Sequence, residues 1–190
     1  MSLDSIGICS ASLVRLGAHP IRSFSEDTAE SSVCSTLYPI TRDAVLIAHP
    51  WSFSLDQAEL QATGVTSIVG FQFAFALPQD LVRTITAGSR GRDRGLVYRI
   101  RGNELHTESR EVLLTYQRRP SETEFPAYFI PALVGRLAAD LCLPLTENSS
   151  RAELLAKLAI AELQLAKLVD SQQASPRGIE DFPLIEARFQ

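Results

Sequence analysis

Apolar residues recur every three or four positions through the first fifty residues, a spacing that predicts two helices. The first helix is expected over residues 3–16, because Gly17 then supplies the left-handed cap that often follows a helix. The second is expected to begin at Ser25 and to end at His49, with a kink at Pro39. Since the connection is short, the two helices are predicted to pack antiparallel as a hairpin.

The period then changes to two. Trp51, Phe53 and Leu55 alternate with polar residues, which predicts a half-buried strand, and a second alternating run of phenylalanines follows. Further along, Gly102-Asn103 is a predicted hairpin turn. We therefore expect a small antiparallel sheet over residues 51–120, inserted between helical segments.

Helical periodicity returns over residues 121–174 and predicts a pair of helices. Pro144 is expected to end the first, and Ser150 with Glu153 has the spacing of a capping box that begins the second. A helix that is apolar on two sides usually contacts two neighbours, and one of them could be another subunit. The last helix has two such stripes: Leu154, Leu158, Ala161, Leu165 and Leu168, and beside them Leu155, Ala159, Ala166 and Val169.

Residues 175–190 lack this periodicity and contain two prolines and a glycine, so they are predicted to form an extended tail. Such a tail is either disordered or docked on a partner. The whole pattern predicts a mainly α fold of the α+β type. Its expected parts are a helical hairpin (1–50), a β-rich insertion (51–120) and a helical pair (121–174) within one domain, followed by the tail. The apolar residues of the tail that could act as docking anchors are Ile179, Phe182, Leu184, Ile185 and Phe189.

Composition narrows the classes of function. A formal net charge of −4 over 190 residues gives no electrostatic reason to expect nucleic-acid wrapping. The three cysteines have no CxxC spacing and do not indicate a disulfide framework. No signal-peptide pattern begins the chain, and no apolar run looks long enough to span a bilayer, so we expect no membrane contact.

Catalytic and ligand-binding motifs are missing from the sequence. There is no nucleophile elbow, no HxxxH metal spacing and no glycine-rich nucleotide loop, so we expect neither an enzyme nor a cofactor or metal site. His19 and His49 each precede a proline at a predicted helix end, where capping is the simplest role. The sharpest basic cluster is a loop that is either solvated or in contact with a phosphate backbone or an acidic partner: Arg90, Arg92 and Arg94.

Several stretches of the chain, in order, resemble the head-to-tail adaptor proteins of tailed bacteriophages, the tail tubular protein A-like family. In the N-terminal part they are residues 5–9, 13, 16–18, 23–24, 29–30, 37–39, 41–44 and 49–53, the last reading HPWSF. Further on they are residues 73–80, 98–107, 133–141 and 182–188.

The resemblance implies a structural virion protein, made in the host cytoplasm and located at the head–tail junction. Family members form a ring, usually of twelve copies, below the portal protein, and they dock the next tail component, a nozzle or stopper. DNA passes through the channel without specific binding. From the resemblance we also predict that the tail contacts the portal or an adjacent subunit. The loop of Arg90, Arg92 and Arg94 is more basic than the family pattern and could contact the lumen or a partner.

Three alternatives stay open at this point. One is a cytoplasmic helical interaction or regulatory protein unconnected with virions. Another is a different head-completion protein, such as a stopper. The third is an enzyme whose motifs are not legible in the sequence, which a deep apolar pocket with convergent polar groups would favour.

Overall fold

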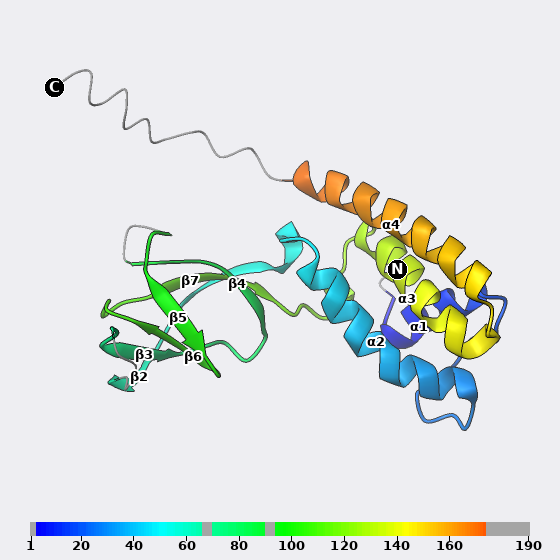
Figure 1. Cartoon of the computed structure of the whole chain (residues 1–190), viewed down its shortest axis with the longest axis horizontal. Helices are drawn as coiled ribbons and strands as arrows, with labels where there is room; N and C mark the ends of the chain where they lie inside the picture. Colours follow the sequence, from blue (N-terminus) through cyan, green and yellow to red (C-terminus); the bar gives the residue numbers. More distant parts are fainter. Residues whose placement is uncertain (1–2, 66–69, 90–93, 174–190) are drawn as a thin grey trace, which may run out of the picture.

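The chain folds into a helical unit and a β unit that lie end to end, as Figure 1 shows. This arrangement comes from a computed structural model, which describes residues 3–65, 70–89 and 94–173. Each unit has its own hydrophobic core. The chain leaves the helical unit after α2, completes the β unit, and returns to form α3 and α4.

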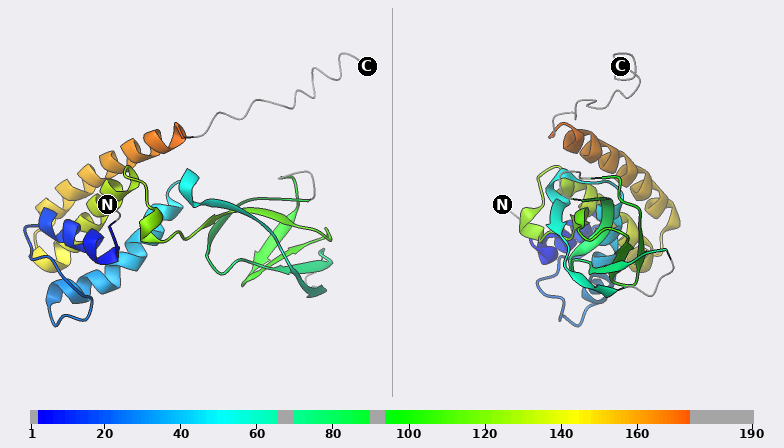
Figure 2. Two further views of the ribbon diagram at one scale, coloured as in Figure 1. Left: turned by 180° about the vertical axis from the view of Figure 1, so that it is seen from behind. Right: turned by 90° about the vertical axis from the view of Figure 1, so that its left-hand side faces the viewer.

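One central helix organises the helical unit. α3 packs against α1, α2 and α4, whereas α1 and α2 contact each other far less. The predicted α1–α2 hairpin is therefore wrong as a packing unit, because both helices lay their apolar faces on α3. Figure 2 shows α4 running along the outside of this unit. The helices are α1 (Ser5–Arg15), α2 (Ala29–Ile47), α3 (Phe129–Thr146) and α4 (Ser149–Ser171).

Side-chain caps set the helix ends, and two of them differ from the prediction. Thr28 caps α2 in place of Ser25, since its hydroxyl accepts from the Ser31 N–H at 3.2 Å. Asn148 caps α4 in place of Ser150. Pro144 lies inside the last turns of α3, which ends instead where Glu147 turns left-handed with φ 52°.

The β unit contains two antiparallel sheets, where the sequence predicted one. Among the described residues, 48% helix and 22% strand make this a mixed α+β fold, so the prediction of a mainly α fold is wrong. The predicted turn at Gly102-Asn103 is confirmed, with Gly102 at φ 60°. One sheet has the order β1 (Leu55–Glu59), β7 (Leu113–Arg118), β4 (Leu81–Gly88). The other has the order β2 (Ala62–Val65), β3 (Phe73–Ala76), β6 (Glu104–Thr107), β5 (Tyr98–Arg101).

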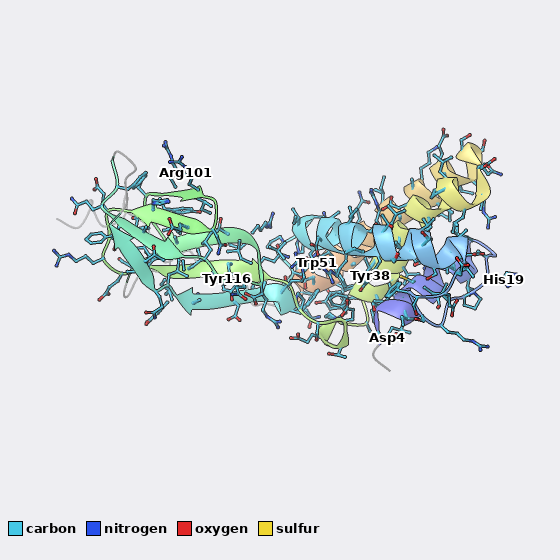
Figure 3. All side chains as sticks on the ribbon, turned by 90° about the horizontal axis from the view of Figure 1, so that it is seen from below. Asp4, His19, Tyr38, Trp51, Arg101 and Tyr116 are labelled. Carbon is cyan, nitrogen blue, oxygen red and sulfur yellow. The ribbon has the colours of Figure 1, made fainter. Side chains whose placement is uncertain are left out.

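Trp51 belongs to the helical core rather than to a strand, which corrects the predicted start of the first strand. Its ring is fully buried against Phe129, with centroids 5.0 Å apart, and its Nε1 donates to the Val45 carbonyl at 2.9 Å. Residues Ser52–Ser54 then form a 3-10 turn before the strand begins at Leu55. Figure 3 shows Trp51 at the junction of the two units.

A buried glutamine forms hydrogen bonds between the two units. Gln117 of β7 is fully buried, and its Nε2 donates to the carbonyls of Leu46 and His49, at 2.7 and 2.9 Å, and to Ser54 Oγ at 2.9 Å. It thereby satisfies the carbonyl of Leu46, one of the terminal carbonyls of α2 that lack a partner within the helix. The orientation of the β unit is thus tied to the end of α2.

α3 is long and apolar enough to cross a bilayer by length and composition, contrary to the sequence-based expectation. Half of this window is buried inside the protein, and α3 packs against all three other helices. These features are typical of the core helix of a globular unit.

Candidate interaction surface

α4 carries an apolar stripe that the other described residues leave uncovered. Its packed side places Ala159 and Ala166, which belong to the second predicted stripe, in the core. The first stripe faces outward, with exposed fractions of 58% for Leu154, 52% for Leu158, 62% for Leu165 and 58% for Leu168, and Ala161 between them is also exposed. The spacing of these five residues is 4-3-4-3, so they lie on one narrow face of the helix. Burying such leucines against another chain is favourable.

Exposed apolar side chains are concentrated on α4 and are not spread evenly over the surface. α4 holds five of the twelve exposed large hydrophobic side chains in the described part of the chain. The fifth, Ile160, is 55% exposed and lies off the stripe. Single exposed apolar residues are normal on a globular surface, whereas an aligned row of them marks a contact surface for another chain.

An ion pair joins α4 to α1 beside the stripe, on the side that faces the rest of the helical unit. Arg15 of α1 reaches Glu162 of α4 with 2.8 Å between Nη1 and Oε2. The pair passes over Gly135 of α3, where a Cβ atom would collide with both side chains. The glycine thus gives the two outer helices a polar contact across the central one. Because both side chains are about one-third exposed, the pair orients α4 more than it stabilises the fold.

A buried carboxylate anchors the end of α4. Asp170 is 3% exposed and accepts hydrogen bonds from Tyr128 Oη at 2.6 Å, from Ser52 Oγ at 2.8 Å and from the Ser52 N–H at 3.1 Å. His49 Nε2 lies 3.1 Å from its other oxygen. His49 therefore contacts this carboxylate, whereas the sequence suggested a capping role for it. Burial and the hydrogen bond to Asp170 raise the pKa of Tyr128 to about 12.

Asp170 was not predicted as a functional residue, although the sequence contains a signal for it. Asp170 continues the packed row of Ala159, Leu163 and Ala166 at steps of four and three, so an acidic residue falls on a buried face. A charged group there needs partners, since unpaired burial is costly. His49 and Ser52 come from the segment that links α2 to the β unit, and Tyr128 directly precedes α3. Helical periodicity does not reveal these contacts.

Of the predicted arginine loop, only Arg94 lies within the described residues, where it is exposed. Arg90 and Arg92 lie outside them. Arg99 and Arg101 on β5 are exposed as well, and Figure 3 shows Arg101 projecting away from the β unit. The predicted docking anchors also lie outside the described residues: Ile179, Phe182, Leu184, Ile185 and Phe189.

We also considered side chains that could bind a metal ion or act as a nucleophile. Within the described residues, no three His, Cys, Asp or Glu side chains lie close enough to hold a metal ion. Cys9, Cys34 and Cys142 are free and buried. The contact with Cys34 and burial both raise the pKa of the Cys9 thiol, which disfavours the reactive thiolate.

One hollow of about 410 Å³ lies in the β unit, between the segments that join β1 to β2 and β6 to β7. Phe75 contributes to its apolar lining, and Glu59, Arg110 and Glu111 contribute to its polar lining. This lining contains no Ser, Cys or His that could act as a nucleophile or a base beside the carboxylates. The α4 stripe is therefore the better candidate for function.

The comparisons with known proteins add no family to this description. No protein-family model matches the chain. A comparison with curated proteins finds no significant match.

Proposed function

We propose that this chain is a structural virion protein, a head-to-tail adaptor. In this role it forms a ring below the portal protein, extends the DNA channel and docks the next tail component. The observation that carries the proposal is the leucine stripe on α4, because a helix already packed on one side presents a second apolar face to another chain. In the assembled ring, a neighbouring subunit or the portal would cover that face.

The two-unit architecture supports the same role. A connector must hold one component at each end, and this chain has two separately cored units lying end to end. Gln117 joins the β unit to the end of α2, and Asp170 fixes the end of α4 beside the same junction. Residues 174–190 follow directly from that fixed point, which suits a segment that reaches the portal or an adjacent subunit.

A second candidate function shares the main observation. The leucine stripe would equally suit a cytoplasmic regulatory protein that binds one helical partner, with no virion involved. The two functions predict different partners when the chain is purified from the cells that make it. An adaptor would co-purify with portal and tail components, whereas a regulatory protein would co-purify with a host protein.

Two variants of the full chain test the adaptor proposal. The first is the double variant Leu158→Ser/Leu165→Ser, which should keep the fold because both residues are exposed. It should reduce co-purification with the portal at least tenfold. Ile160→Ser is the matched control, equally exposed on the same helix but off the stripe, and should co-purify normally. Equal recovery of the portal by all three proteins would remove the stripe from the proposal.

A further inference from the structure

We infer that free copies of this chain pair through α4, with the leucine stripe of one copy lying antiparallel against that of a second copy. The inference concerns the chain before it joins any assembly, so it goes beyond the adaptor role and does not depend on it. A ring needs head-to-tail contacts, whereas this contact is two-fold. The pair would therefore open before the stripe meets a ring neighbour.

The spacing of the stripe points to a helix as the occupant. Steps of four and three from Leu154 to Leu168 follow the seam of a two-stranded coiled coil, in which such residues insert between those of a facing helix. The row covers fourteen residue steps, about 21 Å of helix at the usual rise of 1.5 Å per residue. A second helix laid along it would cover every exposed leucine of the row.

The order of the side chains points to a second copy of α4. The row reads Leu-Leu-Ala-Leu-Leu in either direction: the outer leucines lie seven residues from Ala161 on each side, and the inner ones lie three residues before it and four after it. In an antiparallel pair, Leu154 would meet Leu168 of the second copy and Leu158 would meet Leu165. Ala161 would meet its own counterpart at the two-fold axis, where two small side chains allow close approach of the backbones. A surface that complements itself in this way is what a two-fold contact requires.

The charges beside the stripe permit the antiparallel arrangement. Lys157 on the solvent side would face the neutral Gln164 of the second copy. Glu162 on the other side would face its counterpart, but each of these carboxylates is already paired with an arginine, Arg15 of its own chain. Antiparallel helices also oppose their dipoles favourably, whereas parallel helices align them. The antiparallel pair therefore has no uncompensated like-charge contact.

The residues that follow α4 are a weaker candidate for the occupant. Residues 174–190 contain Pro176, Gly178 and Pro183, which prevent one continuous helix from matching the seam over its length. Coverage of the stripe by this segment is therefore an outcome of the test that would overturn the inference.

The decisive experiment uses two single variants of the full chain, Leu154→Cys and Leu168→Cys, carrying tags of different size. With a short bis-maleimide, the antiparallel pair predicts cross-linked dimers only when the two variants are mixed. Each variant alone should stay uncross-linked, because like positions are then about 21 Å apart. The natural cysteines are buried and should not react, which the unsubstituted chain controls. Cross-linking of each variant alone would indicate a parallel pair and overturn the antiparallel assignment.

Sedimentation equilibrium supplies a second readout. The unsubstituted chain should show a concentration-dependent monomer–dimer equilibrium. Leu158→Ser with Leu165→Ser should weaken it at least tenfold, and Ile160→Ser should leave it unchanged. A monomer at every concentration, or a Leu158→Cys thiol that maleimide reaches only after residues 174–190 are deleted, would overturn the inference. Neither readout involves a virion component, so failure here is distinct from failure of the adaptor proposal.

Discussion

The carboxylate of Asp170 makes more hydrogen bonds than any other side chain on the described part of α4, and its partners come from two other segments of the chain. Removing one partner from a buried network leaves the remaining polar groups unsatisfied. Asp170→Ala should therefore lower the free energy of unfolding by about 2–4 kcal/mol. Urea unfolding measures this change. Glu153→Ala, on an exposed position of the same helix, should change it by less than about 0.5 kcal/mol.

Tyr128 adds a pH dependence to the same network. Its pKa in the folded protein is about 12, above its ordinary value of 10.0. A folded-state pKa raised in this way stabilises the fold fully below pH 10 and loses that contribution as the pH rises through about 12. The stability of the unsubstituted chain relative to Tyr128→Phe should be constant up to pH 10 and then fall. A difference that stayed constant to pH 12 would mean that burial and the hydrogen bond to Asp170 do not raise the pKa of Tyr128.

At the scale of elements, Gln117 of β7 connects the two units through the carbonyls at the end of α2. Gln117→Leu introduces an apolar side chain of similar length and removes the buried Nε2 donor of the Leu46 carbonyl, the His49 carbonyl and Ser54 Oγ. We expect it to cost about 2–4 kcal/mol in urea unfolding. Gln57→Leu is the matched control, because Gln57 lies exposed on β1 and donates only to Thr115 Oγ1. Its cost should stay below about 0.5 kcal/mol.

Elements with strong local signals were predictable from the sequence. All four helices were expected near their observed positions, because helical periodicity reports one buried face. The Gly102-Asn103 turn was expected because its backbone conformation favours glycine. The two stripes of α4 were also separated correctly, although periodicity alone did not say which one would be exposed.

The features that were predicted wrongly are determined by contacts between segments that are distant in the sequence. Nothing local shows that α1 and α2 both pack on α3, or that the strands divide into two sheets. Trp51 alternates with polar neighbours like a strand residue, yet its ring is buried against Phe129 from far along the chain. Asp170 is the same kind of case, since its hydrogen-bond partners lie 42 to 121 residues away. Periodicity describes the face of an element but not what that face meets.

At the scale of the whole molecule, the adaptor account divides the chain into a folded body and a terminal attachment segment. Among the described residues, the buried core residues of both units lie between residues 8 and 166, so we expect the fold to persist without residues 174–190. Deleting the residues after Ala174 should leave the thermal unfolding temperature within about 2 °C of the full chain. The same deletion should abolish attachment to the portal, assayed by co-purification. Unchanged attachment would show that this segment is not the docking element.

The most direct test of the adaptor account is affinity purification of the tagged full chain from the cells that naturally make it. The purified material would be analysed by mass spectrometry and negative-stain imaging. The account predicts recovery of a portal protein together with ring-shaped particles that contain this chain. Recovery of host proteins alone, with no ring and no virion component, would contradict it.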